Sequence, residues 1–125
     1  MKEVFTDKAP AAIGPYSQGI IAGDFMFASG AIGIDPATGE VVEGIEKQTV
    51  QVMENMKAVL AEANADFSQV TKFTIYLNSM DDFATVNELY GEYLTKPYPA
   101  RATVEVSRLP KDVLVEMDAI VYLKK

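Results

Sequence analysis

An arginine and two carboxylates in the last quarter of the chain are the residues whose types and spacing are best suited to chemistry. The segments 101–107 and 113–123 alternate apolar with polar residues, and this period of two predicts β-strands. Both apolar sets are expected to face one helical layer, because a slip of one residue would bury charged side chains there. If the strands pair as a hairpin, Arg101 lies opposite or diagonal to Glu116 or Asp118, as an anion clamp beside a proton-handling carboxylate. The predicted polar face comprises Arg101, Thr103, Glu105, Glu116 and Asp118.

This polar face has two interpretations. Half-solvated antiparallel sheets are common, and surface ion pairs on such a face would stabilise the fold little. However, Leu114, Ile120 and Tyr122 fall on the same face as Glu116. A sheet face that mixes apolar and ionic side chains on a small domain favours a subunit interface, where an Arg and a carboxylate would be partly desolvated. Spacing leaves both interpretations open.

Residue types that are missing from the chain narrow its possible chemistry. The 125 residues include no Cys, which excludes disulfides, thiolate nucleophiles and Cys-ligated metals. They include no His, which removes Ser-His-Asp triads, His-rich metal sites and the commonest general base. Proton transfer must therefore come from Asp, Glu, Lys or Tyr, and no acidic metal-binding loop is visible. A net charge of −7 disfavours a nucleic-acid partner, and no glycine pattern suggests a nucleotide cofactor.

The organisation of the chain is simple. No repeat or linker divides it, so residues 1–125 are expected to form a single domain. No apolar run approaches the roughly 20 residues that cross a bilayer. The first residues lack a basic segment followed by a long apolar one, so no signal peptide is expected. A cytoplasmic location is the remaining expectation.

Periodicity and turn residues predict eight elements in the order β-β-β-α-β-α-β-β, an α+β domain with two helices packed on one face of a mixed sheet. Gly23-Asp24 suits a tight hairpin turn, the segment 35–39 a second turn, and Asn64 a left-handed helix end. The expected elements are a short N-terminal strand, hairpin arms at 17–22 and 25–29, a helix of about 18 residues around 49–63, a strand at 70–78, a helix from Ser79 or Asp81 to before Pro97, and strands at 101–107 and 113–123.

Several separate segments, in a matching order, resemble the RidA/YjgF family, whose members also carry the names endoribonuclease L-PSP and translation inhibitor. The similarity runs from about residue 3 to residue 123. The segments are APAAIGPYSQG at 9–19, ASG at 28–30, DFATVN at 82–87, PARATVEV at 99–106 and RLPKDVLVE at 108–116.

The resemblance implies a chorismate-mutase-like fold and a homotrimer with ligand sites between subunits. It implies hydrolysis of reactive enamines and imines, such as 2-aminoacrylate/2-iminopropanoate and 2-iminobutanoate, to 2-keto acids and ammonia. No cofactor, metal, membrane or nucleic acid is implied in that reaction. Two alternatives remain: a trimer that binds 2-keto acids or regulates without turnover, and an RNA-cleaving translation inhibitor, which the acidic charge and the missing His disfavour.

The resemblance also implies roles for individual residues. Arg101 would bind the substrate carboxylate through its guanidinium fork. Glu116 would position the attacking water and help to activate it. Thr103 stands where many members carry Cys and would offer its backbone, as would Gly30. The implied substrate-binding set is Tyr16, Ser29, Gly30, Asn87 and Thr103.

Overall fold

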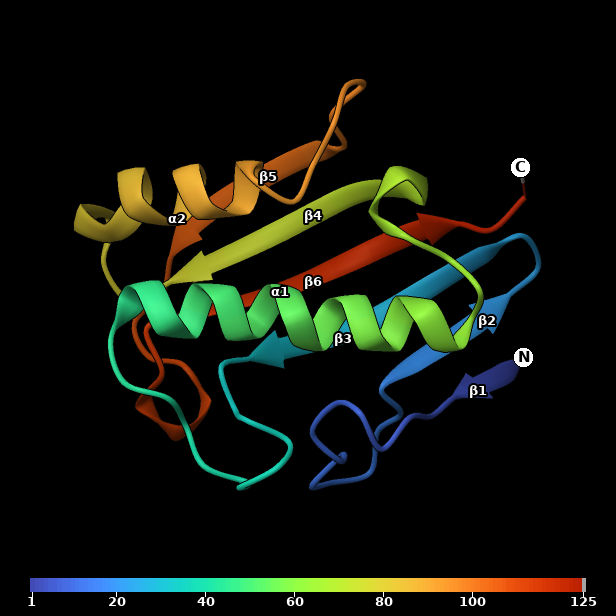
Figure 1. The fold of residues 1–125 in the computed structure, drawn as a ribbon, viewed down its shortest axis with the longest axis horizontal. Helices are drawn as coiled ribbons and strands as arrows, with labels where there is room; N and C mark the ends of the chain where they lie inside the picture. The colour runs from blue at the N-terminus through green and yellow to red at the C-terminus, as the bar shows by residue number, and fades with distance from the viewer. Residues whose placement is uncertain (125) are drawn as a thin grey trace.

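The computed structural model describes residues 1–124, which form a mixed six-stranded sheet with two helices packed on one of its faces (Figure 1). The α+β class and the order β-β-β-α-β-α-β-β are therefore confirmed. The elements are β1 (Lys2–Val4), β2 (Gly19–Ala22), β3 (Phe25–Ile32), α1 (Ile45–Glu62), β4 (Val70–Leu77), α2 (Phe83–Gly91), β5 (Ala100–Glu105) and β6 (Val115–Tyr122), with short 3-10 helices at Phe67–Gln69, Met80–Asp82 and Pro110–Asp112.

The predicted turns, the end of α1 and the start of the second helical segment are confirmed, whereas α2 ends at Gly91, earlier than the expected end before Pro97. Gly23 has φ 61° in the β2–β3 hairpin turn, and Gly39 has φ 75° in the second turn. Asn64, with φ 56°, follows α1 in the left-handed conformation. The Ser79 side chain accepts a hydrogen bond from the backbone N–H of Asp81, so the second helical segment begins with a 3-10 turn that leads into α2.

The core lies between the helices and the sheet. Helix α1 crosses over β3 and β6, and α2 lies beside it over the part of the sheet near β4 (Figure 1). Met53 and Met56 of α1, Met117 of β6 and Phe73 of β4 are almost entirely buried. The ring of Phe73 meets Tyr90 of α2 edge-on at 5.3 Å between centroids. Within residues 1–124, neither helix is long and apolar enough to cross a membrane.

The predicted pairing of the last two strands is wrong. The sheet order is β1-β2-β3-β6-β4-β5, so β4 lies between β5 and β6. Strand β5 pairs with β4 in parallel, whereas β6 pairs with β4 in the antiparallel direction. The reason is that β4, α2 and β5 form a crossover unit, which places β5 beside β4 at the edge of the sheet.

This order also overturns the predicted common polar face. Arg101 pairs with Phe73, which faces the helices, whereas Glu116 pairs with Tyr76 on the other face. Arg101, Thr103 and Glu105 therefore lie on the helix side, and Glu116 and Asp118 lie on the opposite side. The apolar set of β5 faces away from the helices, and Val104 is 43% exposed. On an edge strand that is incompletely covered, alternation alone does not reveal which face is buried.

Candidate functional site

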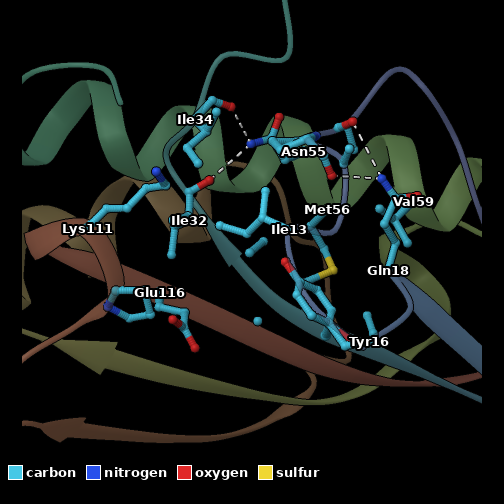
Figure 2. Close-up of a pocket in the computed structure, with 18 residues that line it drawn as sticks. Ile13, Tyr16, Gln18, Ile32, Ile34, Asn55, Met56, Val59, Lys111 and Glu116 are labelled. Atoms are coloured by element: carbon cyan, nitrogen blue, oxygen red, sulfur yellow. Dashed lines mark hydrogen bonds between the residues drawn. The ribbon is translucent and has the colours of Figure 1, made fainter. Parts of the chain in front are cut away.

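A cavity of about 460 Å³ opens where the end of β3, helix α1 and the N-terminal loop come together (Figure 2). Four of the predicted site residues line it: Tyr16, Ser29, Gly30 and Glu116. Figure 2 shows Glu116 approaching from β6 and Tyr16 from the loop, with α1 behind them. We call this region the Glu116 cavity. Its other walls include Ile13, Gln18, Ile32, Ile34, Asn55, Met56, Val59, Pro110 and Lys111.

The N-terminal loop is fixed at its base and exposed at its tip. The buried Gln18 side chain donates from Nε2 to the carbonyls of Thr6 at 3.0 Å and Pro10 at 2.8 Å. Its Oε1 accepts from the N–H of Thr6 at 2.8 Å. Ile13 and Tyr16, in contrast, are 74% and 48% exposed. Gln18 thus holds the loop so that these two side chains lie at the cavity mouth. Gln18 is not among the predicted site residues, although it lies within the matching segment 9–19.

A bulge in β3 forms the wall nearest Glu116. The register with β6 shifts between Ala28 and Ala31, which sets Ser29 and Gly30 against a single residue of β6. The Ser29 hydroxyl donates to the carbonyl of Ser17 at 2.6 Å. A Cβ placed on Gly30 would collide with the Glu116 carboxylate, 2.8 Å from its Cδ. Only glycine therefore leaves room for this carboxylate at the wall.

Glu116 is half-buried in this cavity. Burial, and secondarily the nearby Asp118 carboxylate, raise the pKa of Glu116 above its usual range. A carboxylate with a raised pKa is a stronger base, and it can accept a proton from a water molecule held in the cavity. Lys111 contributes a cation to the cavity rim, from a loop in which Lys111 and Asp112 both have φ 55°.

Buried polar side chains of α1 support the cavity from below. Asn55 is 2% exposed and donates from Nδ2 to the carbonyls of Ile34 at 2.8 Å and Ile32 at 3.1 Å (Figure 2). Gln48 accepts the N–H of Leu114 at 2.8 Å, just before β6 begins. These bonds fix the end of β3 and the start of β6, on which the cavity depends. Asn55 and Gln48 are not among the predicted site residues. Their positions next to the apolar residues of the helix could have indicated buried polar side chains.

The other predicted residues lie on a different part of the molecule, which we call the Arg101 edge. The Arg101 Nη1 donates to Oδ1 of Asn87 at 2.5 Å, and its Cζ lies 5.5 Å from the ring centroids of both Phe83 and Tyr90. Phe83, Asn87 and Tyr90 share one face of α2, at spacings of four and three residues. The Thr103 hydroxyl is buried nearby without a hydrogen-bond partner among the described residues.

The two regions cannot form one site within a single chain. Strand β4 separates β5 from β6, and neighbouring strands lie about 4.8 Å apart. In addition, Arg101 lies on the helix side of the sheet and Glu116 on the opposite side. One chain therefore presents two separate candidate regions, an edge that carries an exposed guanidinium and a cavity that carries a half-buried carboxylate. In the part of the chain that the structure describes, no group of three or more acidic side chains is placed to hold a metal ion.

Comparison with known proteins assigns the family. The model of the endoribonuclease L-PSP family matches residues 6–123, and the chain belongs to this family, that of the RidA/YjgF proteins. A RutC family protein of Pyrococcus abyssi is 58% identical over 95% of this chain and 94% of its own length. The 2-iminobutanoate/2-iminopropanoate deaminase of Salmonella typhimurium is 44% identical over 95% of each chain. A Lactococcus lactis protein named as regulator AldR is 46% identical over 99% of each.

Solved structures show the same fold. RidA from an Antarctic Psychrobacter superposes with a TM-score of 0.95 at 44% identity, covering 98% of this chain and 99% of that one. Escherichia coli TdcF with bound serine superposes with a TM-score of 0.92 at 40% identity, covering 98% of each chain. The fold is thus the chorismate-mutase-like fold of the RidA/YjgF proteins.

Proposed function

We propose that the protein hydrolyses reactive enamines and 2-imino acids, such as 2-iminopropanoate and 2-iminobutanoate, to 2-keto acids and ammonia. The relative from Salmonella typhimurium carries the name of this activity. The observation that carries the proposal is the pairing of two complementary half-sites: a guanidinium held for an anion and a half-buried carboxylate with a raised pKa. We propose that the reaction takes place in the cytoplasm and needs no cofactor.

The complete site forms between subunits of a homotrimer, where the Arg101 edge of one chain meets the Glu116 cavity of another. Three features support this assembly. Strand β5 is an edge strand with open backbone groups. The sheet face away from the helices carries large apolar side chains, with Phe27 47% and Tyr122 40% exposed. Arg101 and Glu116 lie on opposite faces of one chain, so they can meet only across an interface.

At the Arg101 edge, the guanidinium binds the substrate carboxylate. A planar guanidinium matches a carboxylate with two parallel hydrogen bonds. Asn87 accepts one N–H of Arg101, while the rings of Phe83 and Tyr90 hold the guanidinium in place, so little side-chain freedom is lost on binding. The Thr103 backbone offers a further hydrogen bond to the ligand, and its buried hydroxyl has no hydrogen-bond partner within residues 1–124.

In the Glu116 cavity, the carboxylate holds and activates water. Tyr16 covers the mouth, while Ser29 and the Gly30 backbone line the wall. Glu116 takes a proton as the water oxygen bonds to the electrophilic imine carbon and the C=N double bond becomes single. Glu116 then gives this proton to the nitrogen, which forms a carbinolamine. The hydroxyl proton of the carbinolamine passes to the nitrogen by way of Glu116, the C–N bond breaks as C=O forms, and ammonia leaves. Binding of the substrate carboxylate by Arg101 holds the imine carbon beside the oriented water, and this positioning supplies much of the rate enhancement.

A coupled assay tests the activity. Threonine dehydratase acting on L-threonine generates 2-iminobutanoate, and semicarbazide traps the imine that persists. We expect the protein to suppress the trapped product and Arg101→Ala to abolish this effect. Asp24→Asn, a change in the hairpin turn far from both half-sites, is the matched control. If the wild-type protein leaves the trapped product unchanged, the deaminase proposal fails.

Mixing two inactive variants tests the assembly of the site. Arg101→Ala and Glu116→Gln trimers are dissociated, combined and reassembled. With random exchange of equal amounts, about a quarter of the sites pair an intact Arg101 with an intact Glu116 from different chains. We expect activity to return to about that fraction of the wild-type value. A mixture that stays inactive although the chains exchange contradicts a site between subunits.

A second candidate function is binding of 2-keto acids for regulation, without turnover. The relative named as regulator AldR favours this reading, because it matches along almost its whole length. The same two half-sites would bind the 2-keto acid. Binding of 2-ketobutanoate that depends on Arg101, together with unchanged imine decay, would support it over the enzyme. RNA cleavage is less favoured, because the chain carries a net charge of −7 and no His.

A further inference from the structure

Three polar side chains gather on the sheet face away from the helices. Tyr76 of β4 pairs directly with Glu116 of β6, and Asp118 follows two residues after Glu116 on the same face. The Tyr76 hydroxyl donates to Oδ2 of Asp118 at 2.8 Å. Thus Asp118 is held in place on the same strand face as Glu116, and Gly30 of the β3 bulge lies against the Glu116 carboxylate.

The surroundings of Glu116 contain few other charges. On its β3 side the bulge offers only Ser29 and Gly30, which are uncharged. Tyr16 from the N-terminal loop and Lys111 from the rim line the same cavity. Along β4 on the same face, Lys72 lies next to Ile120, four residues beyond Glu116. Among these groups, the carboxylate of Asp118 is the charge that raises the pKa of Glu116, after the effect of burial.

We propose that Asp118, held by Tyr76, is a positioning residue that sets how strongly Glu116 binds a proton and so its strength as a base toward water. This inference rests on the proposed function, in which Glu116 activates the attacking water. Asp118 touches neither water nor substrate in this role. It acts through space, because a like charge on the same strand face disfavours the ionised form of Glu116.

The electrostatics agree with this arrangement. Burial raises the pKa of Glu116, and the Asp118 charge raises it further. The hydrogen bond to Asp118 is also the main reason why the pKa of Tyr76 is raised, so Tyr76 remains a neutral donor. A carboxylate is a better general base when its pKa lies closer to the working pH. The three side chains therefore act as one unit on the face that carries the chemistry.

Asp118→Asn isolates the charge, because the amide oxygen can still accept the Tyr76 hydroxyl. The carboxyl carbons of ¹³C-labelled glutamates are followed by NMR against pH in the intact protein, and Glu116→Gln assigns the Glu116 signal. We expect the Glu116 titration midpoint to move to lower pH in Asp118→Asn. Asp24→Asn removes one negative charge from the hairpin turn and is expected to leave the midpoint in place.

Tyr76→Phe provides a second variant. It keeps the Asp118 charge but removes its hydrogen-bond donor, so the midpoint should move in the same direction by less. The acid limb of the pH profile of kcat/KM should shift with the midpoint in each variant. An Asp118→Asn midpoint that stays put or rises overturns the proposal. Absence of imine hydrolysis in the wild-type protein, with the NMR shift present, overturns the proposed function and leaves the coupling standing.

Discussion

The Arg101 edge and the Glu116 cavity differ in how each is held. At the edge, an exposed Arg101 is fixed by side chains of a single helix, α2: one amide and two rings. In the cavity, Glu116 is half-buried against the β3 bulge, and the surrounding backbone is tied to α1 by buried Asn55 and Gln48. The edge is therefore local and open, whereas the cavity depends on packing between distant parts of the chain.

This difference separates residues that affect activity alone from residues that also affect the stability of the fold. Arg101 and Asn87 can change without disturbing the core, because both side chains are exposed, whereas Tyr90 at the same edge is 5% exposed and belongs to the core. Residues around the Glu116 cavity contribute to both the core and the site. Substitutions of Arg101 or Asn87 should therefore alter activity alone, and substitutions around the cavity should alter stability as well.

The largest effect is expected from Arg101→Ala. Loss of a charge-assisted bidentate interaction of roughly 3 kcal/mol corresponds to about a 100-fold fall in kcat/KM. Arg101→Lys keeps the charge but loses the planar fork, so it should recover only part of the loss. Initial rates of 2-iminobutanoate hydrolysis measure both. Equal activity of the Lys variant and the wild type would show that the fork has no role.

Two asparagines test the separation of the regions directly. Asn55→Ala leaves the carbonyls of Ile32 and Ile34 without their donor in a buried site, at a cost of about 2–3 kcal/mol in the free energy of unfolding. Asn87→Ala at the exposed edge should leave that free energy within about 0.5 kcal/mol and raise KM instead. Urea unfolding gives the first quantity and kinetics the second. If Asn55→Ala and Asn87→Ala lower the free energy of unfolding equally, the proposed difference between the cavity and the edge is wrong.

Gly30→Ala addresses the cavity wall. The new methyl group would occupy the place of the Glu116 carboxylate and displace it. We expect kcat to fall by about 10-fold, less than the roughly 100-fold or more that a positioned general base contributes, because the carboxylate is displaced and not removed. Gly91→Ala is the matched control, because a Cβ there meets no atom within 4 Å. If Gly30→Ala keeps full activity, Glu116 does not act from the position seen here.

The smallest effect is expected from Phe83→Leu. The leucine retains apolar contact with the Arg101 side chain but removes one of the two rings beneath its guanidinium. A partly exposed cation–π contact is worth about 0.5–1 kcal/mol, so KM should rise about twofold to fivefold with kcat nearly unchanged. A change in kcat alone would mean that Phe83 acts on something other than carboxylate binding.

Much of the fold and part of the site could be predicted from the sequence. The apolar spacing of α1 and the glycine and asparagine positions at the turns are local signals, and the structure agrees with them. The segments 9–19 and 108–116 indicated the family, which the family match confirms. The roles of Arg101 and Glu116 in catalysis remain predictions, as do those of Tyr16, Ser29, Gly30, Asn87 and Thr103.

The sequence by itself determined the type and order of the elements, because periodicity and turn chemistry act within a few residues. Only the tertiary structure decided the strand order and, with it, the faces on which Arg101 and Glu116 lie. An alternating strand shows two distinct faces but not which one is covered, and β5 became an edge strand through its long-range pairing with β4. That pairing is the physical reason why Arg101 and Glu116 do not meet in one site within a single chain.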